Sequence, residues 1–245
     1  MSSLHVAVIV FGCSFVSAVV GMALKLPDHH RAPDSRDAVK LVMALIATIS
    51  ALVLSLLIAS ANSQFNTQRS DLQSLSANII LLDRLLISYG PEARESRDGL
   101  RDVVVVMHDR IWSPGGVKAA DLGSATKFLN QVQSLTPKTE NQRSIHAFAL
   151  RETEALLHTR LLMFEQLGHT LSGAVLTVLV GWICVLFLGF GLFTRFNVTV
   201  TVALLLGAIS VSGAIFIIVD LGEPFSGLLR VSDAPLLNAL AQIKQ

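Results

Sequence analysis

Residues 41–89 read LVMALIATISALVLSLLIASANSQFNTQRSDLQSLSANIILLDRLLISY, and this stretch decides the fold. Its first part, Leu41–Ser60, contains no Lys, Arg, Asp or Glu. About 20 apolar residues are enough for a helix to cross the roughly 30 Å hydrocarbon core of a bilayer. The composition then turns polar, yet no Gly or Pro occurs from Asp34 to Tyr89. The stretch therefore predicts one helix that crosses a membrane and continues well beyond it.

Three further stretches have the same apolar character: Leu4–Leu24, Leu171–Phe193 and Val198–Val219. None contains a Lys, Arg, Asp or Glu, and a charged side chain at mid-membrane is costly. Over the whole chain 15% of the residues are charged, against roughly a quarter in an ordinary soluble domain. The leader MSSLH has no Lys or Arg, which favours a retained first span over a cleaved signal peptide.

The predicted fold is an all-α membrane protein with four transmembrane helices in two pairs. A long helical extramembrane stalk is inserted between spans two and three. The predicted regions are a first transmembrane helix pair at residues 1–60, the stalk at 61–170, a second pair at 171–220, and a C-terminal motif with a short helix at 221–245.

Small residues recur at four-residue spacing within the spans, as at Ala47, Ala51, Ser55 and Ala59 in the second span. Small residues on one face let membrane helices approach closely, which is how such helices pack in lipid. The packing that they predict could lie within one four-helix unit or between subunits, and both can hold at once.

Helix breakers divide the stalk at Gly90-Pro91, Ser113–Gly116 and Thr136-Pro137. Thr136 and Pro137 have the pattern of an N-cap followed by Pro at the first helical position. A helix is expected to begin there and to run directly into the third span. The stalk would consist of two long helices with two shorter amphipathic helices between them. Four apolar stripes at helical spacing support this reading: Leu72, Leu75, Ile79, Leu82 and Leu86; Leu100, Val103, Val104, Met107 and Ile111; Leu122, Phe128, Leu129, Val132 and Leu135; and Ile145, Phe148, Leu156 and Met163.

The side of the membrane that the stalk faces stays open. Lys and Arg concentrate in short cytoplasmic loops, and the loops opposite the stalk hold five of them, which favours an outward stalk. Counting only flanks of about 20 residues gives the stalk side the same number. The two sets are Lys25, Arg31, Arg36, Lys40 and Arg195 against Arg69, Arg151, Arg160, Arg230 and Lys244. We expect the bacterial inner (plasma) membrane.

Enzyme chemistry has no recognisable basis in the sequence, so we expect no enzyme and no cofactor. No HExxH, GxSxG, P-loop or dinucleotide-binding fingerprint occurs. The pair His29-His30 could hold a metal ion, but we interpret it as part of a solvated polar loop. Cys13 and Cys184 lie inside apolar runs and are typical of packing residues. The formal net charge of +1 gives no reason to expect a nucleic-acid partner.

The most unusual segment follows the fourth span, where residues 220–232 read DLGEPFSGLLRVS. The proline and the glycine predict a turn, which lets the phenylalanine pack back against protein or lipid. The arginine is placed to pair with one of the two acids. The segment could be a structural stop at the end of the span or the charged mouth of an ion pathway. Its candidate functional residues are Asp220, Glu223, Pro224, Phe225, Gly227 and Arg230.

This spacing, D-L-x-x-P-F-S-G-x-x-x-V-S after a final span, resembles the closing motif of the bestrophin-like family of four-span bacterial membrane proteins, a family of uncharacterised function. The layout of two plus two spans around a helical insert is also similar. The family often has Asp or Asn two positions before the proline, where this chain has Gly222. The family's name implies likeness to bestrophins, which are oligomeric anion channels with cytosolic termini. The resemblance thus implies a cytosolic stalk, against the outward stalk that the loop charges favour.

Two functions compete. The first is a homo-oligomeric membrane ion channel, anion-conducting by the resemblance to bestrophins, because a ring of subunits can form an axial pore from one helix of each. The second span is the best lining candidate, since it carries hydroxyl groups and ends in an uncharged polar run, although a wet stalk surface explains that run equally well. The candidate pore-lining residues are Thr48, Ser55, Asn62, Gln64 and Asn66. The expected partners are the lipid bilayer, inorganic ions and further copies of the chain.

The alternative is a non-conducting membrane scaffold or sensor whose stalk binds a partner. The two short amphipathic helices motivate it, because each needs a surface to cover its apolar face. That surface could be the long helices, another subunit or a different protein.

Overall fold

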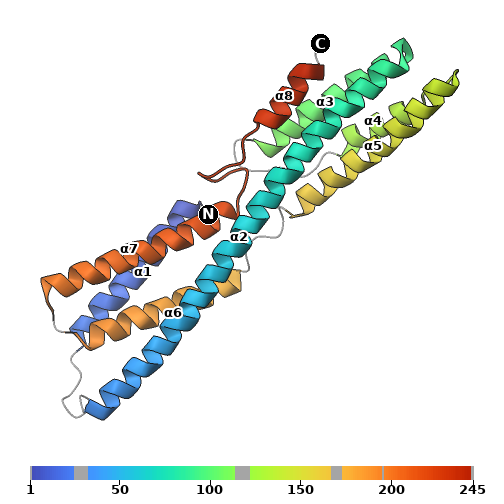
Figure 1. Ribbon diagram of the computed structural model, residues 1–245. Helices are drawn as coiled ribbons and strands as arrows, with labels where there is room; N and C mark the ends of the chain where they lie inside the picture. The colour runs from blue at the N-terminus through green and yellow to red at the C-terminus, as the bar shows by residue number, and fades with distance from the viewer. Residues whose placement is uncertain (1, 25–32, 114–121, 167–172, 195, 244–245) are drawn as a thin grey trace. The chain divides into compact units, whose positions relative to one another are not determined.

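The computed structural model describes residues 2–24, 33–113, 122–166, 173–194 and 196–243, and the regular elements in these ranges are helices (Figure 1). Four of them are long and apolar enough to cross a membrane, which confirms the predicted all-α fold with four spans. These are α1 (Ser3–Ala23), α2 (Pro33–Tyr89), α6 (Gly173–Leu192) and α7 (Val198–Leu221). The chain is therefore an integral membrane protein.

Helix α2 continues far beyond the membrane, as the absence of breakers predicts. Its 57 residues extend over about 85 Å at 1.5 Å per residue, nearly three times the thickness of the hydrocarbon core. The helix ends before Gly90, whose φ of 124° lies in a region that glycine adopts readily and other residues avoid. A short 3₁₀ turn, η2 (Pro91–Ala93), then leads into α3 (Arg94–Ile111).

The contacts divide the chain into two compact units. The membrane unit comprises Met1–Gln64 and Thr170–Gly222, and the stalk unit comprises Phe65–His169 and Glu223–Gln245. Helix α2 contributes its first part to the membrane unit and its last part to the stalk unit. The C-terminal segment, predicted as a separate region at 221–245, shares the stalk unit with the helical insert.

In the membrane unit α1 is the central helix, because it packs against both α6 and α7. It crosses α6 where Gly21 meets Gly191, and a Cβ on either glycine would overlap a backbone carbonyl oxygen of the other helix. Small residues permit such a close approach, so Gly191 is a packing glycine. The Ser212 hydroxyl of α7 donates a hydrogen bond of 2.8 Å to the carbonyl oxygen of Ala7 in α1.

The stalk unit contains the last part of α2 together with α3, α4 (Leu122–Gln133), α5 (Glu140–Gln166) and α8 (Ala234–Ile243). The predicted stripes of α2 and α3 lie in its core with relative exposures of 1% or less. The β-branched run Val103–Val106 is helical. The apolar faces of these helices are thus covered by the chain's own stalk unit.

The stripes of α4 and α5 are less completely buried. In α4, Phe128 and Val132 are buried, and in α5, Leu156 and Met163 are buried. Phe148 of α5 is exposed, and the guanidinium of Arg151 lies 5.7 Å from the centre of its ring. A cation over an aromatic face gives this exposed ring a favourable contact.

The predicted start of α5 at Thr136 and Pro137 is wrong, because the helix begins at Glu140. Thr139 is the cap, since its Oγ1 accepts a hydrogen bond of 3.1 Å from the amide of Gln142. The Gln142 side chain also caps this end of the helix, because its Oε1 accepts a hydrogen bond of 2.9 Å from the amide of Lys138. A threonine with a glutamine three residues later is a capping box, and it outweighs the Thr-Pro pair. The predicted junction of α5 with the third span falls on residues 167–172, outside the described residues.

Candidate functional site

Helix α2 is the least covered of the four membrane helices. In its most apolar window 11% of the residues are buried, against 28% in α1, 28% in α6 and 22% in α7. Leucines on the membrane-unit part of this helix are exposed, among them Leu45, Leu52 and Leu56. One side of α2 is therefore left for lipid or for other protein.

A line of small and polar residues runs along this exposed side. Thr48, Ser55 and Asn62 are exposed and follow one another at intervals of seven residues, which is two helical turns. Exposed alanines lie on the same side: Ala44 precedes Thr48, and Ala51 lies between Thr48 and Ser55. The hydroxyl of Thr48 donates to the carbonyl oxygen of Ala44 at 2.9 Å, so its proton is satisfied within the helix and its oxygen remains an acceptor.

The other two candidate pore-lining residues lie on different sides of α2. Asn66 is exposed and follows Asn62 by about one turn, at the beginning of the stalk-unit part of α2. Gln64 is half-buried and lies two residues from each of them, which places it about 160° away around the helix. The helical geometry therefore puts Thr48, Ser55, Asn62 and Asn66 on one face of α2, and Gln64 on another.

The opposite side of α2 faces the interior of the membrane unit. Ser50 is buried there, and a Cβ on Gly189 of α6 would overlap the side chain of Met43. Val53, Leu54 and Leu57 pack against the apolar core that α1, α6 and α7 form. The polar line and the packed face are thus distinct sides of the same helix.

The C-terminal motif begins inside the membrane unit with Asp220. Its carboxylate is fully buried, and the Ser3 hydroxyl donates a hydrogen bond of 2.7 Å to Oδ1. A carboxylate near the C-terminal end of a helix is opposed by the helix dipole, so a donor is needed to hold it there. The bond joins the start of α1 to the end of α7.

The rest of the motif folds in the stalk unit as a tight loop. The carbonyl oxygen of Glu223 accepts from the amide of Gly227 at 3.0 Å, and the carbonyl oxygen of Pro224 accepts from the amide of Val231 at 2.7 Å. Phe225 is buried, with its ring 5.6 Å from that of Trp112 at an angle of 85°. The predicted turn therefore packs its phenylalanine against protein.

Trp112, at the end of α3, is the residue that sequence reasoning missed. Its indole nitrogen donates to the carbonyl oxygen of Val231 at 3.3 Å, and the ring of His108 stacks on it at 5.3 Å. His108 Nε2 also lies 3.5 Å from Asp233 Oδ2. We name residues 223–243 the strap, because these contacts fasten the segment to α3.

Arg230 does not pair with the acids of the motif in the described part of the chain. It is exposed on the strap, while the Glu223 carboxylate accepts a hydrogen bond of 3.3 Å from the Ser226 hydroxyl. His29 and His30, the candidate metal ligands of the sequence, lie outside the described residues.

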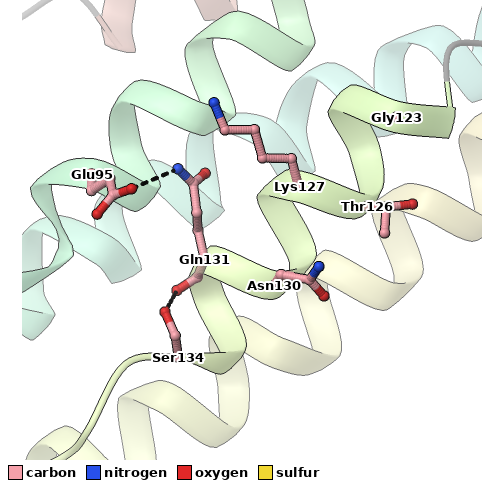
Figure 2. A pocket seen from close by; sticks show the side chains of 7 residues that line it. All are labelled: Glu95, Gly123, Thr126, Lys127, Asn130, Gln131 and Ser134. Carbon is pink, nitrogen blue, oxygen red and sulfur yellow. Dashed lines mark hydrogen bonds between the residues drawn. The ribbon is translucent and has the colours of Figure 1, made fainter.

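A polar groove lies between α3 and α4 in the stalk unit (Figure 2). The amide of Gln131 donates to Glu95 Oε1 at 3.2 Å, and the Ser134 hydroxyl donates to the Gln131 carbonyl oxygen at 2.9 Å. Its charged side chains, Glu95 and Lys127, have opposite signs. The groove therefore lacks the array of like charges that would attract one kind of ion.

Comparisons with known proteins give one consistent result. The model of one protein family, described as "Bestrophin-like domain", matches residues 10–236. The fold is similar to crystal structures of a bacterial bestrophin homologue from Klebsiella pneumoniae, each with a single mutation. One is 11% identical with a TM-score of 0.72 and covers 99% of this chain and 97% of that chain. A second is 10% identical with a TM-score of 0.69, and each chain is covered to 97%. No curated protein matches the sequence significantly.

Proposed function

The chain belongs to the bestrophin-like family, and from this premise we propose that it is an ion channel in which several copies of the chain surround one conducting pathway. The proposed location is the inner (plasma) membrane of a bacterium. In each copy, α2 would face the pathway. The ions would be small inorganic anions.

The exposed polar line of α2 carries this proposal. If that side faces hydrocarbon, the Asn62 amide finds no water to bond, and the Thr48 hydroxyl keeps only the hydrogen bond that it donates within the helix. A ring of such helices around water satisfies these groups, and the small side chains leave room for ions. The exposed leucines beside the line, such as Leu52 and Leu56, would then contact neighbouring copies or lipid.

The scaffold alternative loses the observation that motivated it. The short helices α3 and α4 were expected to need a partner surface, but the predicted stripe of α3, together with Phe128 and Val132 of α4, lies in the stalk unit's own core. A channel accounts for the open face of α2, whereas a scaffold gives that face no role.

Cysteine accessibility tests the proposal directly. The background would have Cys13 and Cys184 replaced by serine, and Ser55→Cys would then be introduced. In a water-filled pathway, a charged methanethiosulfonate reagent should reach this thiolate and reduce the current of the purified protein in a planar bilayer. Ser50→Cys is the matched control, because Ser50 lies on the buried side of the same helix and its current should not change.

Two results would contradict the proposal. One is a wild-type protein that carries no current over a range of voltage, pH and salt. The other is equal sensitivity of the Ser55→Cys and Ser50→Cys proteins to the reagent. Mass measurement of the intact complex in mild detergent would give the number of copies, and a monomer would exclude a pathway built from several α2 helices.

A further inference from the structure

Within the membrane unit, the two flanks of the polar line on α2 differ in shape. One flank carries four leucines that lie within about 60° of one another around the helix. Each of them is at least 60% exposed. Leu45 precedes Thr48 by three residues, which places this flank about 60° from the polar line. We name these four residues the leucine ridge: Leu41, Leu45, Leu52 and Leu56.

The other flank carries an open groove between α2 and α6. Ala47 lines it and precedes Thr48 by one residue, which places it about 100° from Thr48, in the direction opposite to Leu45. The groove has a volume of 420 Å³ and combines small residues of α2 with aromatic residues near the end of α6. These are Ala44, Ala47, Phe190 and Phe193. The polar line thus runs between an apolar ridge and a largely apolar hollow.

The groove exists because one side chain stands between the two helices. A Cβ on Gly189 would overlap the side chain of Met43, so α2 rests on α6 through this methionine and the gap beside it stays open. The polar groups of the groove are already engaged. Lys40 Nζ lies 3.0 Å from Asp37 Oδ1, and Thr194 donates its hydroxyl proton to the backbone of α6. What the groove offers a partner is therefore mainly apolar surface.

We infer that the leucine ridge of one copy packs into the groove between α2 and α6 of the next copy, and that this contact closes the ring around the pathway. The inference rests on the proposed function, because it takes the polar line as the side of α2 that faces the pathway. Each helix of a ring then meets its two neighbours on the two flanks of that side. A ring is built by head-to-tail contacts, which join two different surfaces of the same chain.

Symmetry decides which leucines enter the groove. Rotation about the membrane normal keeps every residue at its own depth, so a groove that runs from Lys40 to Ala47 meets the leucines of that level in the next copy. These are Leu41 and Leu45. The small side chains of Ala44 and Ala47 leave room for them and let the two helices approach closely.

The position of the groove favours a second copy over a lipid as its occupant. An acyl chain would also fill an apolar groove, but it would bring hydrocarbon next to the polar line, whose groups need water. A neighbouring α2 helix covers the groove with protein and keeps the water of the pathway apart from the bilayer.

Disulfide cross-linking of the full-length chain in membranes tests the inference. In a background with Cys13 and Cys184 replaced by serine, Leu45→Cys and Ala47→Cys are introduced together. The two side chains point about 160° apart around α2, so they cannot form a disulfide within one copy. A mild oxidant should convert the double variant into a ladder of linked copies on a non-reducing gel. Each single variant should stay unlinked, because a ring brings Leu45 against Ala47 and neither residue against itself.

A second groove between the same two helices supplies matched controls. Val39 and Ala38 line that groove instead. Val39→Cys with Leu41→Cys has the same two-residue spacing and also uses the leucine ridge, and it should give no ladder. Ala47→Phe fills the groove beside the polar line and should lower the share of intact complex in mild detergent several-fold, measured by mass. Ala38→Phe should leave that share unchanged.

The outcomes distinguish the inference from the function on which it rests. If the wild type conducts but the Leu45→Cys, Ala47→Cys protein gives no ladder and Ala47→Phe leaves the complex intact, lipid or nothing occupies the groove. The inference would then be overturned and the channel proposal would stand. A ladder from the Val39→Cys, Leu41→Cys protein, or linked dimers from either single variant, would also overturn it. A wild type that is a monomer without current would refute the proposed function itself.

Discussion

The stalk unit and the membrane unit bury their side chains in opposite ways. In the stalk unit large apolar residues lie inside, and Leu82 and Phe128 are fully buried. In the membrane unit many large apolar residues, such as Leu52, are exposed, while small ones such as Ala18 are buried between the helices beside larger ones such as Leu179. Water drives large apolar groups inside, whereas lipid leaves many of them outside, and small residues inside let helix backbones approach closely.

The largest expected effect would come from breaking the stalk core. Phe128→Ala should lower the free energy of unfolding by about 3–5 kcal/mol, because it removes a fully buried ring and leaves a cavity. Phe196→Ala in the membrane unit is the matched control, since Phe196 is 73% exposed. It should change stability by about 0.5 kcal/mol or less. Unfolding in detergent, followed by helical circular dichroism, measures both, and equal losses would contradict the contrast between the units.

A smaller effect should come from the glycine crossing of α1 and α6. Gly191→Ala places a Cβ where a backbone carbonyl oxygen of α1 already lies, so the helices must separate, at a cost of about 1–3 kcal/mol. Gly181 is in the same helix, and nothing lies within 4 Å of the Cβ that an alanine would add. Gly181→Ala should be neutral or stabilising by up to about 1 kcal/mol.

The same unfolding measurement compares these two glycine variants. The contrast should be visible as a lower midpoint for Gly191→Ala and an unchanged or higher one for Gly181→Ala. A tolerated alanine at position 191 would mean that close backbone contact does not hold the membrane unit together, and the proposed difference between the two units would fail.

The different rules of the two units also decide what could be predicted from the sequence. In the stalk, periodic stripes such as Leu72 to Leu86 identify the buried faces, because water imposes the pattern. In the membrane, a uniformly apolar stretch predicts that a span exists but does not show which of its sides faces the other helices. Membership of the polar run 60–68 does not say which side of the helix a residue faces. Helical spacing does, and it could have separated Gln64 from Asn62 and Asn66.

Contacts between residues far apart in the chain also could not be predicted from the sequence. The motif of the strap predicts a turn and a buried phenylalanine, but its partner Trp112 lies on α3, and the bond from Trp112 to Val231 joins residues 119 positions apart. The helix start was also misassigned at Thr136, because two competing capping signals lie within four residues. The bond from the Gln142 amide to Thr139 and the bond from the Lys138 amide to the Gln142 side chain decide between them.

The smallest expected effect concerns single hydrogen bonds, one in each unit. Ser212→Ala removes the bond from α7 to the carbonyl oxygen of Ala7, and such bonds between membrane helices average about 0.6 kcal/mol. Trp112→Phe keeps a ring against Phe225 but removes the indole donor to Val231, which should cost about 0.5–1.5 kcal/mol.

Both losses should be small beside that of Gly191→Ala or Phe128→Ala, because neither unit depends on one polar bond. Ser212→Ala is the sharper of the two tests, since the serine is buried and its removal leaves a carbonyl oxygen that already accepts a bond within α1. The measurement is again the unfolding midpoint in detergent. A loss of several kcal/mol would show that polar bonds, rather than close backbone contact, fix the arrangement of α1 and α7. The membrane unit would then depend on specific side-chain contacts, as the stalk unit does. The two units would differ only in the kind of contact, polar in one and apolar in the other.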